Sequence, residues 1–157
     1  MITVQAEDFD LAAEYESLRA DVGDIGAIVT FTGLVREFYV PDSDEALLGG
    51  TTQTLYLEHY PGMTEKSLQE IVAQAESRWP LLGTRVIHRV GELHPGDQIV
   101  MVATASSHRH AAFEAAEFIM DYLKSHAPFW KKQTSASSSD WISSRSSDSE
   151  ALKRWQD

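Results

Sequence analysis

The 157-residue sequence contains no cysteine. This absence excludes disulfide bonds, thiolate metal sites and a cysteine nucleophile within the chain. If the protein handles sulfur, that sulfur must be supplied by a partner or by a substrate.

The sequence also lacks any apolar run close to the roughly 20 residues that cross a bilayer, so we expect no membrane span. Its first residues, MITVQAEDFD, have neither the basic start nor the apolar core of a signal peptide. We therefore expect a cytoplasmic location. The length and a hydrophobic content of 43% predict one globular domain over residues 1–157.

Basic residues are scarce, with 13 Lys and Arg against 24 Asp and Glu and a net charge of −11. The first 58 residues contain half of the acidic residues, but only Arg19 and Arg36 are basic. This balance argues against nucleic-acid binding, whose affinity depends on neutralising phosphates. The acidic region is either a solvated surface or a docking face for a basic partner.

Hydrophobic periodicity predicts three helices and five strands. The predicted helices are Asp8–Ala20, Met63–Trp79 and His108–His126, and the predicted strands are Ile2–Gln5, Gly26–Arg36, Leu55–Tyr60, Thr84–Val90 and Gln98–Ala105. Because some strands follow one another and others are separated by helices, we predict an α+β fold with a largely antiparallel sheet and packed helices. We also expect a loop over Val40–Thr54, a type II turn at Pro95-Gly96, and Ser106 or Ser107 as the cap of the third helix.

The last part of the chain is unusual in composition. Nine of the fifteen residues from Ser135 to Ser149 are serine, which predicts a flexible tail over about residues 135–150. Trp141, Ile142 and Trp155 are apolar, however, so we expect the tail to dock on a surface, for instance that of a second subunit.

Cationic side chains gather around one predicted helix. The segment Ser106–Gln133 contains three His, one Arg and three Lys, which in so acidic a chain indicates a site for a small anion. At the start of the helix, His108 and Arg109 lie where free backbone N–H groups and the helix dipole favour an anion. A turn whose polar residues merely face water fits these two residues equally well.

Two lysines flank the end of the same helix. Pro128 prevents the helix from continuing and disfavours helical geometry at Ala127, so the chain can fold Lys131 back toward Lys124. If one of two neighbouring amines is neutral it can act as nucleophile or base, while its protonated neighbour stabilises negative charge. The alternative for Lys124 is an exposed lysine paired with Asp121.

Arg36 ends an apolar strand, where it either binds an anion or forms an ion pair with Glu37 or Glu58. The six histidines are spread along the chain at positions 59, 88, 94, 108, 110 and 126. Only the pair at 108 and 110 is closely spaced, and residues two apart on a helix point in different directions. Without cysteine or an HExxH pattern, we expect no metal site and no resident cofactor.

Four ordered blocks of this sequence resemble the family of molybdopterin synthase catalytic (large) subunits. They are GAIVTFTGLVR (26–36), LEHYPGMTEKSL (57–68), RVIHRVGELHPGDQIV (85–100) and HRHAAFEAAEFIMDYLKSHAPFWKK (108–132), followed by DWISSR and a closing KRW. The resemblance implies an α/β hammerhead-like fold that forms a homodimer. It further implies a heterotetramer with a small ubiquitin-like sulfur-carrier subunit, whose tail ends in Gly-Gly and carries a thiocarboxylate.

The activity implied by the resemblance is sulfur transfer from that tail to cyclic pyranopterin monophosphate, which forms the dithiolene of molybdopterin in molybdenum cofactor biosynthesis. By motif, the family's catalytic lysines correspond to Lys124 and Lys131, and its substrate-binding residues to Arg36, His108, Arg109 and, in the tail, Arg145. The sequence departs from the family pattern in the residues that follow Arg36 and in the Ser-rich tail. Two other activities stay open, namely a noncatalytic module that binds a partner's C-terminal carboxylate and a phosphohydrolase that uses His108.

Overall fold

A computed structural model describes residues 1–36, 54–135, 138–142 and 146–156 of the chain. The predicted loop Val40–Thr54 lies, except for its last residue, outside the described residues. In chain order the elements are β1 (Ile2–Gln5), α1 (Leu11–Asp21), β2 (Ala27–Leu34), β3 (Thr54–His59), α2 (Met63–Arg78), β4 (Leu81–Arg89), β5 (Gly91–Leu93), β6 (Gln98–Ser106), α3 (Arg109–His126), β7 (Phe129–Ser135), β8 (Ser138–Ile142), α4 (Ser146–Leu152) and the 3-10 helix η2 (Lys153–Trp155).

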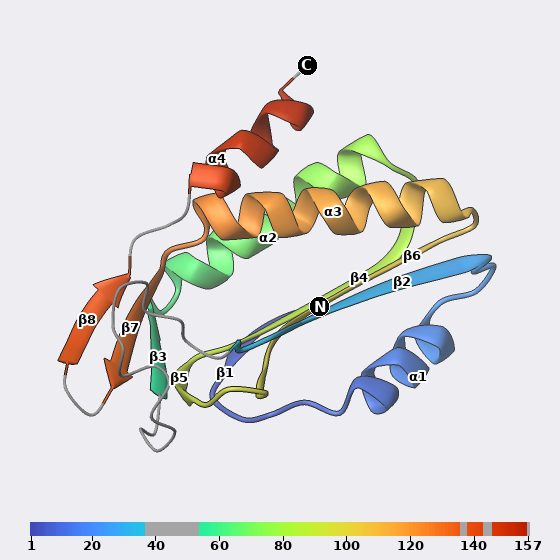
Figure 1. The fold of residues 1–157 in the computed structure, drawn as a ribbon. Helices are drawn as coiled ribbons and strands as arrows, with labels where there is room; N and C mark the ends of the chain where they lie inside the picture. The colour runs from blue at the N-terminus through green and yellow to red at the C-terminus, as the bar shows by residue number, and fades with distance from the viewer. Residues whose placement is uncertain (37–53, 136–137, 143–145, 157) are drawn as a thin grey trace.

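The strands form two four-stranded sheets, with the orders β1-β4-β6-β2 and β5-β3-β7-β8. Strands β1 and β4 pair in parallel, and the other described pairs are antiparallel. Figure 1 shows α2 and α3 over one face of the first sheet and α1 beneath the other. The second sheet lies beyond one end of the first, close to the C-terminal end of α3. The predicted α+β fold with largely antiparallel strand pairing and packed helices is confirmed, but the described strands form two sheets rather than the one expected.

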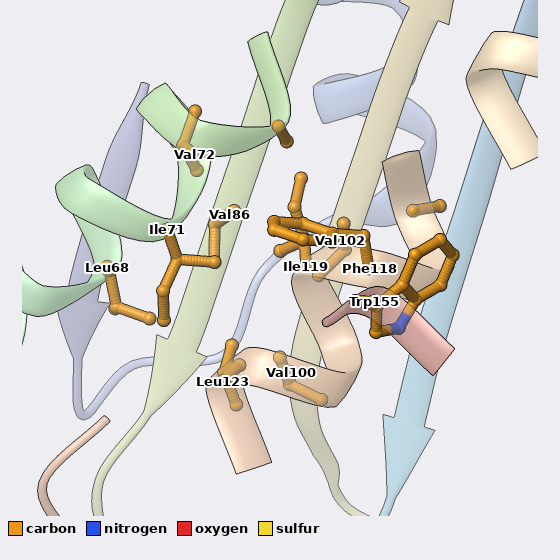
Figure 2. Close-up of a cluster of buried hydrophobic side chains, with 12 residues drawn as sticks. Leu68, Ile71, Val72, Val86, Val100, Val102, Phe118, Ile119, Leu123 and Trp155 are labelled. Atoms are coloured by element: carbon orange, nitrogen blue, oxygen red, sulfur yellow. The ribbon is translucent and has the colours of Figure 1, made fainter. Parts of the chain in front are cut away.

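The alternation of side chains along the central strands explains this layering. Val86 and Val102 point toward α2 and α3, where they join a core cluster that includes Phe118 (Figure 2). Their neighbours Ile87 and Met101 point to the opposite face and pack against α1. Because successive side chains of a strand alternate between faces, an uninterrupted apolar run in a central strand requires cover on both sides.

Three strands, two short helices and one helix cap differ from the expectation. The two helices are α4, which overlaps the segment predicted as a flexible tail, and η2, which follows it. Strand β5 is only three residues long, and β7 and β8 have the polar composition of a loop, so local pattern did not reveal them; pairing with distant strands stabilises them instead. The N-cap residue of α3 is His108, without a side-chain cap hydrogen bond. The predicted cap by Ser106 or Ser107 is wrong: the Ser106 hydroxyl donates to the Pro80 carbonyl at 2.9 Å, and the Ser107 hydroxyl donates to the Asp24 carbonyl at 3.4 Å.

The C-terminal end packs on α3 of the same chain. Trp155 is 5% exposed, and its Nε1 donates to Asp121 Oδ2 at 2.6 Å. Arg154 forms ion pairs with Glu114 at 2.8 Å and Glu117 at 2.6 Å. The predicted docking is confirmed for this end, but its surface is the chain's own helix rather than a second subunit.

Candidate functional site

The two lysines predicted to act together lie on either side of a sharp end of α3. Lys124 is in the last turn of the helix, and Ala127, the C-cap residue, adopts the extended angles φ −79° and ψ 128°. This confirms the expected effect of Pro128 on the residue before it. The chain then runs directly into β7, which contains Lys131.

The register of the second sheet determines which way Lys131 points. Within the β3–β7 pair, Leu57 lies opposite Lys131 and His59 lies opposite Phe129. Directly opposed residues share one face of a sheet, and Leu57 is buried. Lys131, Phe129 and His59 therefore lie on the face that turns toward the first sheet, although the end of Lys131 is exposed.

His88 of β4 lies where the lysine-bearing elements meet. It is 5% exposed, and its ring stacks on Phe129 with centroids 3.8 Å apart and planes at 19°. Lys131 and Lys124 are both close enough to His88 for their charges to act on it. The structure thus brings the two lysines to one place, around a buried imidazole. We call His59, His88, Lys124 and Lys131 the lysine cluster.

The charge state of His88 follows from this environment. Burial lowers the pKa of the His88 imidazole to about 4, against the opposing effect of the 2.8 Å contact between its Nδ1 and the Arg89 carbonyl. The positive charges of Lys131, Lys124 and a protonated His59 lower this pKa further. At neutral pH the ring is therefore uncharged, and positive charge in the cluster belongs to the lysines.

The turn between the lysines is tied to the start of α2 by one buried hydroxyl. Thr64 is fully buried; its Oγ1 donates to the Pro128 carbonyl and accepts from the Tyr60 N–H, each at 2.9 Å. His59, the last residue of β3, makes a second contact with α2: its Nε2 lies 3.5 Å from Glu65 Oε1. These contacts fix the turn, and hence both lysines, against α2.

Arg36 is positioned by the turn predicted at Pro95-Gly96. Gly96 has the positive φ of +91° that a type II turn requires, and Asp97 N donates to His94 O at 2.9 Å. The turn then exchanges two 2.8 Å backbone hydrogen bonds with Val35, the buried residue before Arg36. Arg36 itself is exposed, and it leaves the first sheet beside β3, since Val35 packs against β3 residues.

His108 and Arg109 lie at the opposite end of α3 from Lys124. Both are exposed, and the first turn of the helix has no side-chain cap and no acidic residue, so its N–H groups and dipole are available to an anion. Arg109 and Lys124 are 15 positions apart, which is about 22 Å along a helix axis. Within one chain the His-Arg pair and Lys124 therefore lie at opposite ends of α3; Figure 1 shows the course of this helix.

The structure also bears on the ion pairs that the sequence left open for Lys124 and Arg36. Asp121 is engaged by Trp155, and among the described residues no ion pair joins it to Lys124. Arg36 forms no ion pair with Glu58 within the described part of the chain, and Glu37 lies outside it. Arg145, the predicted tail arginine, is also outside the described residues.

No group of three potential metal ligands occurs among the residues that the structure describes. In the same residues, no helix has both the length and the apolar character needed to cross a membrane.

Sequence reasoning missed three members of this site. His59 and His88 were considered only as metal ligands, and Thr64 was not considered at all. The available signal was weak: both histidines lie in blocks that resemble the family, LEHYPG and VIHRVG. Their proximity depends on the pairing of β3 with β7 and on the approach of the two sheets, which no local pattern predicts.

Comparison with known proteins identifies the family of the chain. A profile described as MoaE protein matches residues 4–126, a range that includes Arg36, His108, Arg109 and Lys124 but not Lys131. The molybdopterin synthase catalytic subunit of Vibrio cholerae is 54% identical over 155 residues, covering 99% of this chain and 97% of that protein. That of Escherichia coli K12 is 51% identical over 154 residues, covering 98% and 97%.

Solved structures agree with the sequence comparison. The molybdopterin biosynthesis MoaE protein from Burkholderia ambifaria has a TM-score of 0.81 and 49% identity, covering 99% of this chain and 98% of that one. The crystal structure of molybdopterin synthase from Staphylococcus aureus has a TM-score of 0.74 and 31% identity, covering 89% and 95%. The chain therefore belongs to the MoaE protein family.

Proposed function

We propose that this chain is the catalytic subunit of molybdopterin synthase and transfers sulfur to cyclic pyranopterin monophosphate. The sulfur donor is the thiocarboxylated Gly-Gly terminus of a small ubiquitin-like subunit. The observation that carries the proposal is the convergence of Lys124 and Lys131 on His88 in a chain of this family. We keep the cytoplasmic location expected from the sequence as part of the proposal.

The lysines supply the two kinds of help that this reaction needs. The thiocarboxylate sulfur attacks an electrophilic carbon of the substrate and forms a C–S bond, while the C–O bond at that carbon breaks and the departing oxygen takes up a proton. Tail and substrate are then joined through a thioester. Water then cleaves the bond between the carbonyl carbon and sulfur, leaving sulfur on the substrate and a carboxylate on the tail. A protonated lysine stabilises the oxyanion of that step, and a neutral lysine accepts the proton of the attacking water.

The exposure of both lysines supports a donor that arrives from outside the chain. Lys124 and Lys131 are exposed residues, while His88 and Thr64, which lie next to the elements that carry them, are buried. An extended peptide terminus can therefore reach the amines without unfolding the site. The absence of cysteine fits the same scheme, since the sulfur is carried by the partner.

We further propose that the substrate's phosphate and pterin are held by His108 and Arg109, together with Arg36 and Arg145. Arg binds phosphate through two parallel hydrogen bonds, and His offers a further donor. Since about 22 Å of helix separates Arg109 from Lys124, one chain cannot present both to a small substrate. The proposal therefore requires a homodimer, in which the His-Arg pair of one protomer completes the lysine cluster of the other.

Exposed apolar residues along β2 and on α3 support such a homodimer. Strand β2 is at an edge of the first sheet, and its Phe31 and Leu34 are 42% and 55% exposed. On α3, which packs over β2, Phe113 is 60% exposed. An open strand edge flanked by large apolar side chains is commonly covered by another chain.

The test is reconstitution from purified components. The chain is mixed with cyclic pyranopterin monophosphate and the small subunit in its thiocarboxylate or its ordinary carboxylate form, and molybdopterin is measured. We expect product only with the thiocarboxylate, and two sulfurs consumed for each dithiolene. Binding of both tails without product would instead indicate a noncatalytic carboxylate-binding module, and phosphate release without a sulfur donor would indicate a phosphohydrolase.

A further inference from the structure

His88 has no role in the proposed chemistry, yet it is the buried centre of the lysine cluster. Its ring lies on β4 of the first sheet, and the aromatic ring stacked on it, Phe129, is the first residue of β7 in the second. The stack is thus a direct contact between the two sheets, and Phe129 follows Ala127, the C-cap residue of α3, by two positions. Lys131 follows Phe129 by two positions and lies on the same strand face.

The hydrogen bond of the ring determines its tautomer. His88 Nδ1 lies 2.8 Å from the Arg89 carbonyl oxygen, which can only accept, so the ring proton is on Nδ1. Nε2 of the neutral ring then has a lone pair. The same hydrogen bond ties the ring to the backbone where the chain leaves β4 and turns, through Gly91 at φ +87°, into β5.

The charged groups that face His88 come from three other elements. They are Lys131 of β7, Lys124 of α3 and His59 of β3, the last of which contacts Glu65 of α2. A positive charge on the His88 ring would be repelled by positive charge on either lysine. A ring that stays uncharged can therefore sit between these groups, whereas a lysine or arginine in its place would disturb them.

We infer that His88 is a positioning residue of the sulfur-transfer site, whose neutral ring holds Phe129, and through β7 Lys131, in register with Lys124. The inference rests on the proposed function, since it assigns His88 a role only if the lysines act on the transferred sulfur. His88 does not contact the tail or the substrate in this role. It fixes the geometry of the amines, and small errors in such geometry cost large factors in rate.

Two substitutions separate the ring stack from the imidazole chemistry. His88→Ala removes the stack, and we expect kcat for molybdopterin formation to fall about tenfold or more, with KM for the substrate and affinity for the small subunit within about twofold. His88→Phe keeps an uncharged ring on Phe129, and we expect it to recover kcat to within about threefold of the wild type. A merely structural role would not lower kcat while leaving KM nearly unchanged.

Leu18→Ala is the matched control, since Leu18 is buried to 2% exposure in the cluster under α1, on the other face of the first sheet. It should lower the unfolding midpoint but leave kcat unchanged. Unchanged kcat in His88→Ala, or an equal loss of kcat in Leu18→Ala, would overturn the positioning role. Lys124→Ala and Lys131→Ala are assayed in the same experiment. If both variants are fully active, the proposed function of the lysines is wrong. If both are inactive while His88→Ala is active, only the positioning role is wrong.

Discussion

The two ends of α3 carry the residues proposed for chemistry, and they are built in different ways. At the C-terminal end, Lys124 lies beside a buried histidine, a paired strand and a turn held by Thr64, all from the same chain. At the N-terminal end, His108 and Arg109 are exposed, with no side-chain cap and no acidic residue in the first turn. The lysine end is therefore assembled within one chain, whereas the other end presents its groups outward.

The largest expected effect comes from removing the amine at the assembled end. Lys124→Ala should lower the rate of molybdopterin formation about 100-fold or more, because it removes a group that moves a proton or stabilises an oxyanion. Binding of the small subunit should persist, since only one exposed side chain is truncated. Single-turnover formation of molybdopterin measures the rate.

Lys66→Ala provides the control for that experiment, because Lys66 is an exposed lysine of α2 with no assigned role. Its rate should equal that of the wild type. A Lys124→Ala rate within a factor of two of the Lys66→Ala rate would contradict the assignment of the lysine end.

A second effect concerns pH, and it arises from the histidine buried at the lysine end. The pKa of His88 is lowered from 6.5 to about 4 by folding, so between these values the unfolded chain binds more protons. His88 therefore contributes stability that is full above about pH 6.5 and is lost as the pH falls toward 4, by about 3 kcal/mol in total. Urea unfolding at pH 7 and pH 4.5 measures the loss.

His88→Phe removes this titration while keeping a ring on Phe129, so its stability should fall less over the same pH interval. Equal losses in the wild type and the variant would show that the buried imidazole does not control the acid response.

The smallest of these effects concerns the turn that joins the lysines. Thr64→Val leaves the Pro128 carbonyl and the Tyr60 N–H without their buried partner, which should lower the free energy of unfolding by about 1–3 kcal/mol. Ser77→Ala is the matched control, since the Ser77 hydroxyl donates to Gln74 O at an exposed position. Its cost should stay within about 0.5 kcal/mol, and equal costs for the two variants would remove the special role of Thr64.

The elements of this fold that follow from local pattern were predictable. The Ile2–Gln5 strand is confirmed with identical bounds, and α2 and α3 end within one residue of their predicted ends. The extended geometry at Ala127 follows from Pro128 alone. These features depend on neighbours in sequence, which periodicity and proline chemistry describe well.

The features that depend on distant pairing were not predictable. Strands β7 and β8 exist because β3 offers an edge for β7 and β7 one for β8, and the Ser-rich composition of β8 gives no sign of it. The nearness of Lys131 and Lys124 was allowed by the sequence, but His88, the group between them, is contributed by a strand more than 30 residues earlier. The packing of Trp155 on α3, with its hydrogen bond to Asp121, likewise depends on residues far apart in the sequence.

One measurement tests the central claim that two protomers share each site. Lys124→Ala and Arg109→Ala, each inactive alone, are mixed, allowed to exchange subunits, and assayed for molybdopterin formation with the thiocarboxylated small subunit. If the lysine cluster of one protomer meets the His-Arg pair of the other, every mixed dimer contains one intact site, so random pairing restores about a quarter of wild-type activity. If mixed dimers form and no activity returns, the account of a site shared between the two ends of α3 is wrong.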